Sequence, residues 1–259
     1  RSVNNIINKG GTILKSARCD DFRTPEGRKT AHEQLLKAGI DAFVVIGGDG
    51  SFTGAMIFNR EYNFPVIGTT FTLGFDTALN TVVECIDKIR DTASSHNRLF
   101  FVEVMGRDVG HIALNAGVGA GAEEILIPEE NLGLDRLLES LKRSKESGKS
   151  SSIVIVAEGD KSGKNVFELK EYVEEHLPIY DVRVSVLGHM QRGGAPSCYD
   201  RVLASRMGVK AVEALLEGKT NLMVGIQDNK LTLTPINKAI KGHTKIDKEL
   251  IRVSEIMTT

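Results

Sequence analysis

A glycine turn that carries one carboxylate is the clearest chemical feature of this sequence. Gly47-Gly48-Asp49-Gly50-Ser51 follows the apolar run Ala42 to Ile46 and precedes a helix-like stretch, Phe52 to Phe58. Glycines allow close backbone approach to phosphate, and N–H groups at a helix N-terminus favour anions. Among phosphates, Asp49 would be repelled unless a divalent cation intervened, so its place suggests Mg²⁺. The alternative interpretation is a tight turn with a capping aspartate.

Three further apolar runs end in polar residues, where ligands of open parallel sheets bind. These runs and the residues that follow them are Leu99 to Val104 with Met105-Gly106-Arg107, Ile153 to Ala157 with Glu158, and Val182 to Leu187 with Gly188-His189-Met190-Gln191-Arg192-Gly193-Gly194. Arginine forks suit phosphate oxygens and a carboxylate suits sugar hydroxyls, so together they indicate a phosphosugar pocket. For Arg107 or His189 alone, a surface salt bridge or a satisfied core histidine stays open.

Two other arginines lie on the apolar runs themselves. Arg98 stands at the start of its run and Arg183 within its run, so neither reaches the carboxyl-end pocket of the same subunit. If they bind phosphate, a neighbouring subunit must present them.

The elements that must position these residues alternate between short apolar runs and amphipathic stretches. Six runs are predicted to be strands: 42–46, 65–67, 99–104, 125–127, 153–157 and 182–187. Helices are predicted after Thr24-Pro25, after Asp76 and through Leu134 to Leu141, and Ser144 to Ser152 is predicted to be a surface loop. This alternation favours an α/β fold with parallel sheets.

Composition excludes several classes of protein. The 259 residues include 33 Lys and Arg against 34 Asp and Glu, and a net charge of -1 gives no field for nucleic acid or anionic lipid. Cys19, Cys85 and Cys198 are odd in number and far apart, which favours free thiols. Without an apolar run long enough to span a bilayer, the expectation is a cytoplasmic protein that binds no nucleic acid and no membrane.

Taken in order, five segments resemble the ATP-dependent 6-phosphofructokinases of the bacterial type: Gly10 to Cys19, Gly47 to Ser51, Gly74 to Ala78, Val104 to Arg107 and Leu187 to Gly194. The resemblance runs from about Gly10 to about Asp228. It implies two Rossmann-like three-layer subdomains with largely parallel sheets and an active site in the cleft between them. The implied domains are 1–74 plus 193–240 for ATP and 75–192 for fructose 6-phosphate, with 241–259 as a peripheral C-terminal segment.

The resemblance also implies roles for individual residues in ATP-dependent, Mg²⁺-dependent phosphorylation of fructose 6-phosphate. Asp49 would serve Mg²⁺, and the implied ATP contacts are Arg18, Cys19, Gly48, Gly50 and Ser51. The implied sugar-phosphate contacts are Met105, Gly106, Arg107, Glu158, His189, Met190, Gln191 and Arg192, with Arg98 and Arg183 from the adjacent subunit of a homotetramer. Arg107 and Arg98 would stabilise the transferring phosphoryl group. Pyrophosphate-dependent relatives resemble this pattern with Asp in place of Gly50.

An effector site between subunits is implied as well. The matching residues are Arg90, Gly121, Ala122, Glu123 and Lys149. Ser147, Ser150 and Ser151 stand where the family commonly has basic residues or histidine, which puts an effector response in doubt.

The largest departure follows Val66-Ile67-Gly68, where the family continues with Pro-Gly-Thr-Ile-Asp-Asn-Asp and this sequence reads Thr69-Thr70-Phe71-Thr72-Leu73. The aspartate that accepts the hydroxyl proton belongs to the absent segment, and Asp76 is better explained as a helix cap. The family's first strand is also absent. We hypothesise that both segments belong to the intact protein although this sequence does not contain them.

Rival interpretations of the site stay open. An NAD or lipid kinase would share Gly47 to Ser51, but Met105 to Arg107 and Leu187 to Gly194 argue against it. A non-catalytic, nucleotide-binding regulatory subunit of the same fold would be expected to lack the catalytic base, as this sequence does. A pyrophosphate-dependent enzyme is the third alternative.

Overall fold

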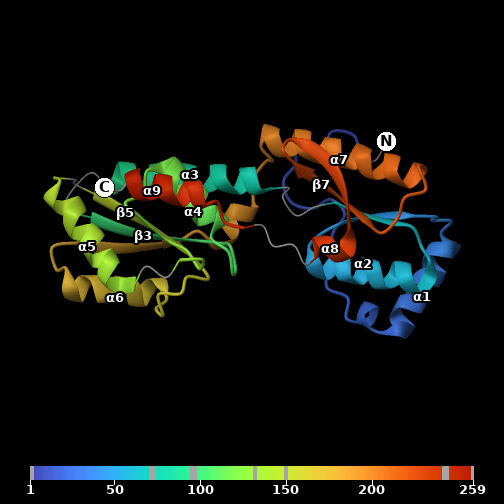
Figure 1. Ribbon diagram of the computed structural model, residues 1–259, viewed down its shortest axis with the longest axis horizontal. Coiled ribbons are helices and arrows are strands. Elements are labelled where there is room, and N and C mark those ends of the chain that lie inside the picture. Colours follow the sequence, from blue (N-terminus) through green and yellow to red (C-terminus); the bar gives the residue numbers. More distant parts are fainter. Residues whose placement is uncertain are drawn as a thin grey trace. The chain divides into compact units, whose positions relative to one another are not determined.

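The computed structural model describes residues 3–69, 74–93, 98–130, 133–148, 151–240 and 245–257. The chain forms two units, Arg1–Gly74 with Pro196–Thr244 and Phe75–Ala195 with Lys245–Thr259. Each unit has helices on both faces of a largely parallel sheet, so the predicted α/β fold class is confirmed (Figure 1). Among the described residues, no helix combines the length and the apolarity that crossing a membrane requires.

The sheet of the first unit has the order β1-β2-β7-β8. Its strands are β1 (Phe43–Ile46), β2 (Val66–Thr69), β7 (Leu222–Gln227) and β8 (Lys230–Pro235). β1, β2 and β7 are parallel, whereas β8 runs antiparallel to β7. The β7–β8 hairpin turns at Asp228 and Asn229, whose φ angles of 48° and 58° are typical of a two-residue type I′ turn.

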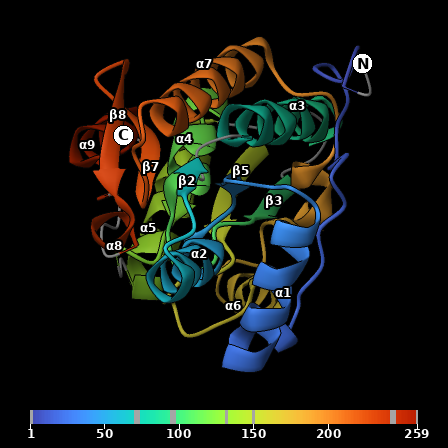
Figure 2. The ribbon, with the colours of Figure 1, turned by 90° about the vertical axis from the view of Figure 1, so that its right-hand side faces the viewer.

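Helices cover both faces of this sheet, as Figure 2 shows for α2 and α7. The helical elements are a 3₁₀ turn (Asp21–Arg23), α1 (Pro25–Lys37), α2 (Asp49–Tyr62), α7 (Cys198–Leu216) and α8 (Ile236–Ala239). On one face Leu203 and Met207 of α7 pack against Ile67, and on the other Phe52 of α2 and Ile236 of α8 pack against the strands. Thr24 caps α1 by accepting the Gly27 N–H at 3.0 Å, as the Thr-Pro sequence predicts.

One ion pair joins α1 to α2. Arg28 is buried, and its Nε and Nη2 atoms each donate to one oxygen of Glu61 at 2.6 Å. Its Nη1 atom donates to the carbonyls of Phe22 and Arg23. This hydrogen bonding lowers the pKa of Glu61 and fixes the chain entering α1.

The sheet of the second unit is entirely parallel, with the order β4-β5-β3-β6. Its strands are β3 (Arg98–Val104), β4 (Glu124–Leu126), β5 (Ser151–Ala157) and β6 (Asp181–Val186). On one face lie α3 (Phe75–Ala93), α4 (His111–Ala120) and α9 (Lys248–Met257), and on the other α5 (Gly133–Glu146) and α6 (Val166–His176). β3 and β5 are central and their apolar residues are buried, except for the half-buried Phe100, as expected for a parallel sheet covered on both faces.

Two sequence expectations differ from this architecture. The expected loop 144–152 is short, since α5 reaches Glu146 and β5 begins at Ser151, and Ser144 and Ser152 are buried and hydrogen-bonded at 3.1 Å. Residues 245–257, expected in a peripheral C-terminal segment, lie in the second unit. Ile246, Leu250 and Ile251 pack on its core and bring α9 against α4.

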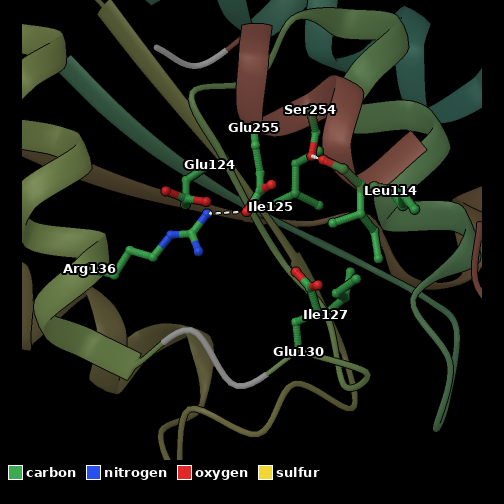
Figure 3. A pocket seen from close by; sticks show the side chains of 9 residues that line it. Leu114, Glu124, Ile125, Ile127, Glu130, Arg136, Ser254 and Glu255 are labelled. Atoms are coloured by element: carbon green, nitrogen blue, oxygen red, sulfur yellow. Dashed lines mark hydrogen bonds and ion pairs between the residues drawn. The ribbon is translucent and has the colours of Figure 1, made fainter. Parts of the chain in front are cut away.

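A small hollow lies where α9 meets α4, β4 and α5 (Figure 3). Its volume is about 10 Å³, room for a single water molecule. Arg136 donates to Glu255 at 3.0 Å, and the two side chains tie α5 to α9. The hollow is too small for a sugar phosphate or a nucleotide.

The Glu124 carboxyl beside this hollow is buried, and burial raises its pKa although Ser140 and Arg136 act in the opposite direction. A raised pKa in the folded state means that stability is greatest at low pH and is lost as pH rises from about 4.5 through the folded pKa. We expect Glu124→Gln to remove this loss and to raise the Tm by a few degrees at pH 8 but not at pH 4. Circular dichroism melts at both pH values test this.

Glu139→Gln, at an exposed position of α5, is the matched control and should leave the pH profile unchanged. Equal pH profiles for the wild type and Glu124→Gln would contradict a destabilising buried carboxylate.

Candidate functional site

Three loops of the second unit leave the same edge of its sheet. β5, β3 and β6 are adjacent and parallel, with Val104 paired to Ala157 and Glu103 paired to Val186, so their carboxyl ends coincide. The predicted sugar-phosphate residues 105–107, Glu158 and 188–192 follow these ends directly. The structure therefore brings them together at one edge.

The loop from β3 to α4 holds Arg107 in an unusual backbone conformation. Arg107 is exposed and has a φ of 55°, a left-handed conformation that costs a residue with a side chain about 1–2 kcal/mol. Glu158 Oε1 accepts the N–H groups of Gly106 and Arg107 at 3.2 and 2.5 Å. These two hydrogen bonds offset part of that cost. They also fix the direction in which the Arg107 side chain leaves the backbone.

Close backbone approach makes glycine necessary beside this loop. A Cβ atom at position 159 would lie 1.9 Å from the Arg107 carbonyl oxygen, and one at position 106 would lie 2.3 Å from the Val109 oxygen. Both are far below any tolerated contact, so Gly106 and Gly159 let the Arg107 loop lie against the chain after β5.

The third loop is a 3₁₀ turn, Gly188–Arg192. His189, Met190 and Arg192 are exposed at the sheet edge, as a ligand-contacting role requires. Gln191 differs, since it is buried, accepts the Met105 N–H at 3.2 Å and donates to the Gly188 carbonyl. Its amide is therefore used to join two loops of the site.

A second carboxyl group lies near Glu158. Burial, and to a smaller extent the Glu158 charge, raises the pKa of Glu103 on β3. Glu158 thus has a second carboxyl group near it, and a carboxylate can accept hydrogen bonds from sugar hydroxyls.

Arg98 and Arg183 lie toward the opposite end of this sheet. Arg98 begins β3, whose seven residues put its two ends about 20 Å apart. Asp181 Oδ2 lies 3.0 Å from Arg183 Nη2 and 3.8 Å from Arg98 Nε. The structure groups the two arginines with each other and separates them from Arg107, as the sequence predicts.

The predicted phosphate-binding turn of the first unit joins β1 to α2. Gly48 occupies the N-cap of α2 without a side-chain cap, so Asp49, Gly50 and Ser51 form the first helical turn and are exposed. A Cβ on Gly50 would meet no atom within 4 Å, which leaves open space above the helix N-terminus. Arg18 and Cys19 are exposed on the chain before α1, in the same unit.

The donor set fits a magnesium ion only when phosphate supplies further ligands. Within the described ranges, no group of three or more His, Cys, Asp or Glu side chains is placed to hold a metal. Asp49 offers one exposed carboxylate at the helix N-terminus, and Mg²⁺ typically combines one or two carboxylates with substrate phosphates and water.

The residues expected at an effector site cluster at the end of α4. Arg90 donates to the carbonyls of Ala120 and Gly121 at 2.8 and 3.0 Å. Glu123 is buried and accepts the Ile153 N–H at 2.5 Å, so its carboxylate also holds β5. Ala122 lies between Gly121 and Glu123, and Lys149 falls outside the described residues.

The connection between β2 and α3 is where the sequence lacks the family's catalytic-base segment. β2 ends at Thr69 and α3 begins at Phe75, and residues 70–73 lie outside the described part. Gly74 has a φ of 91° and donates its N–H to the buried Asp200 carboxylate at 2.9 Å. Between Gly68 and Gly74 this sequence lacks the family's base segment, and the hypothesis that the intact protein contains that segment stays a prediction.

Sequence reasoning missed Glu129 and Asp200. Both carboxylates accept backbone N–H groups next to candidate site segments, Glu129 from Gly110 and Asp200 from Gly74. Glu129 follows the run 125–127, so the carboxyl-end rule applied to that strand would have found it. No comparable signal marks Asp200, which is brought to Gly74 only by the fold.

Comparison with known proteins agrees with this geometry. The family model described as phosphofructokinase matches residues 1–215. The chain is 49% identical to ATP-dependent 6-phosphofructokinase 2 of Bacteroides thetaiotaomicron and 51% identical to the ATP-dependent 6-phosphofructokinase of Bacillus cereus. Each match covers 98% of this chain, with 81% and 82% of the relatives. The chain belongs to the phosphofructokinase family.

Solved structures extend the likeness. Phosphofructokinase of Pichia pastoris in the T-state superposes with a TM-score of 0.84 and 34% identity over 98% of this chain and 30% of that one. The pyrophosphate-dependent enzyme of Marinobacter aquaeolei, with a TM-score of 0.75 over 96% of this chain and 74% of that one, shares the fold at 20% identity. The alignment with the Bacteroides relative spans 264 positions, more than the 259 residues here, so that relative has residues with no counterpart.

Gly159→Ala tests the packing of the Arg107 loop. The new Cβ would overlap the Arg107 carbonyl, so we expect the loop to shift and the Kd for fructose 6-phosphate to rise at least tenfold. Isothermal titration calorimetry measures this. Gly208→Ala on α7, where a Cβ meets nothing within 4 Å, is the matched control and should bind as the wild type does.

Proposed function

We propose that this chain binds ATP on its first unit and fructose 6-phosphate on its second, and transfers the γ-phosphoryl group to the sugar 1-hydroxyl. The glycine turn 47–51 would hold the ATP phosphates, with Gly48, Gly50 and Ser51 supplying backbone N–H groups. The observation that carries the proposal is the convergence of Arg107, Glu158 and the 188–192 turn at one sheet edge. That set combines phosphate-binding and hydroxyl-binding groups in one place.

In the proposed reaction, the 1-hydroxyl oxygen attacks the γ-phosphorus and the bond to the β,γ-bridging oxygen breaks, releasing ADP. Arg107 and Arg98, the latter from an adjacent subunit, would offset the charge on the transferring group. Glu158 would hold sugar hydroxyls, and His189, Arg192 and a neighbour's Arg183 would hold the sugar phosphate. Arg18 and Cys19 would contact the nucleotide. Bound at Asp49, Mg²⁺ would neutralise phosphate charge.

Assembly and location are further parts of the proposal. Arg98 lies at the opposite end of β3 from the carboxyl edge, which supports active sites to which two subunits contribute. We propose that the subunits form a homotetramer. We propose a cytoplasmic location, as for a glycolytic enzyme. Arg90, Gly121, Ala122, Glu123 and Lys149 would form the effector site.

The absence of the base carboxylate from this sequence is expected to lower kcat. General base catalysis contributes about 10²–10⁴-fold, whereas phosphoryl transfer depends mainly on positioning and electrostatic stabilisation. The hydroxyl proton would here pass to solvent. We therefore expect ATP-driven formation of fructose 1,6-bisphosphate with kcat lowered by about 10²–10⁴ relative to a family member with the base.

Inserting the family's Pro-Gly-Thr-Ile-Asp-Asn-Asp segment after Gly68 should recover part of this loss. The same insertion with its aspartates replaced by asparagine is the control. A coupled assay with ATP or pyrophosphate as donor measures both. Turnover only with pyrophosphate would instead support the pyrophosphate-dependent alternative.

Arg107→Ala tests the residue on which the proposed chemistry most depends. Loss of a positioned charge donor typically costs about 10²–10³-fold in turnover, so we expect a decrease of that size. Arg60→Ala, at an exposed position of α2, is the control and should leave turnover unchanged. Near-normal turnover of Arg107→Ala would refute its role.

A second candidate is a non-catalytic, nucleotide-binding regulatory subunit. The absent base segment favours it. Binding of ATP without turnover with either donor, by the wild type and by the insertion variant alike, would select this candidate.

A further inference from the structure

The backbone N–H groups of the Arg107 loop are held by side chains from three other parts of the second unit. Gln191 accepts the N–H of Met105 at 3.2 Å. Glu158 accepts those of Gly106 and Arg107. Both oxygens of Glu129 accept the N–H of Gly110, at 2.9 and 3.0 Å.

Glu129 holds the far end of this loop. Gly110 is the N-cap residue of α4 and lacks a side chain that could cap the helix, so Glu129 supplies a capping carboxylate from another segment. A carboxylate at this place also interacts favourably with the helix dipole. The loop is thereby fixed to the start of a buried helix whose Leu114 and Ala113 lie in the core.

The fit around Gly110 is close. A Cβ there would lie 2.4 Å from Ile127 Cγ2 and 2.8 Å from Glu129 Oε2. The turn that carries Glu129 is itself closed by a hydrogen bond from the Glu130 N–H to the Ile127 carbonyl at 3.2 Å. The backbone of Glu129 is therefore held by this turn, and its side chain reaches Gly110 from a defined position.

We propose that Glu129 is a positioning residue for Arg107. This inference rests on the proposed binding of fructose 6-phosphate. Glu158 holds one end of the loop but is itself expected to contact the sugar, so its substitution mixes two effects. Glu129 holds the other end and is assigned no ligand contact, so it acts on the substrate only through the loop.

The left-handed conformation of Arg107 explains why both ends must be held. Its φ of 55° is unfavourable without support, and release of Gly110 lets residues 107–110 relax toward other conformations. The guanidinium would then leave its place at the sheet edge. Misplacement of a binding group by about 1 Å can cost up to 10²-fold in rate.

The experiment measures loop protection and ligand affinity in the same variants of the full chain. For Glu129→Ala we expect faster amide hydrogen exchange in residues 105–112 and a Kd for fructose 6-phosphate raised about tenfold, the size typical of lost charge-assisted hydrogen bonds. The Kd for ATP should stay close to the wild-type value, and the Tm should fall by only about 2–4 °C, the effect of losing one helix cap. Glu129→Gln keeps an acceptor oxygen and should restore most of the affinity.

Glu130→Ala is the matched control, since it removes the same charge from the adjacent residue, whose side chain lines the hollow at α9 (Figure 3). It should change neither exchange in 105–112 nor the Kd for fructose 6-phosphate. Unchanged exchange in Glu129→Ala, or unchanged affinity with faster exchange, would overturn the proposal.

Failure of the proposed function is distinguishable from failure of this inference. If the wild type does not bind fructose 6-phosphate, the proposed function fails for this ligand and the positioning role fails with it. If the wild type binds and Glu129→Ala binds equally well, only the positioning role fails.

Discussion

The site of the second unit depends on one constraint, which is that backbone N–H groups beyond the end of a strand lose their partners in the sheet and must bond to side chains or to water. Beyond β3 the backbone no longer pairs with β5 and β6, and in the Arg107 loop side chains take over this task. Each acceptor comes from a different strand end, so the loop takes its conformation only when the parallel sheet is assembled. The shape of the site is thus a consequence of strand order.

Much of the fold could be predicted from the sequence. The six predicted strands occur within two residues of their expected ends, because continuous apolar runs of that length are typical of parallel strands covered on both faces. Strands β7 and β8 were not predicted. A weaker signal was present, since Asp228-Asn229, two residue types that tolerate φ above 0°, stand between two runs that contain Leu, Val, Ile and Thr. The position of α9 could not be predicted, because its partners on α4 and β4 are more than a hundred residues away.

For the candidate site, the sequence predicts which residues lie close together but not which of them hold the backbone. The carboxyl-end rule brings Arg107, Glu158 and His189 together and places Arg98 apart from them. It says nothing of which side chains hold the backbone, and so it did not separate Gln191, which is buried, from its exposed neighbours. Hydrogen bonds such as that from Gly74 to Asp200 join residues 126 positions apart and leave no local pattern.

Because Arg98 and Arg183 share the carboxylate of Asp181, the electrostatic attraction of anions to the amino end of this sheet depends on the salt concentration. One carboxylate lies between two guanidinium groups, so Arg98, Arg183 and Asp181 together keep a single positive charge at a partly exposed place. Such a charge is screened by dissolved ions over about 8 Å at physiological ionic strength. Attraction of a dianion to this end of the sheet should therefore weaken as salt is added, and so should the partly exposed ion pairs through which Asp181 holds the two arginines together.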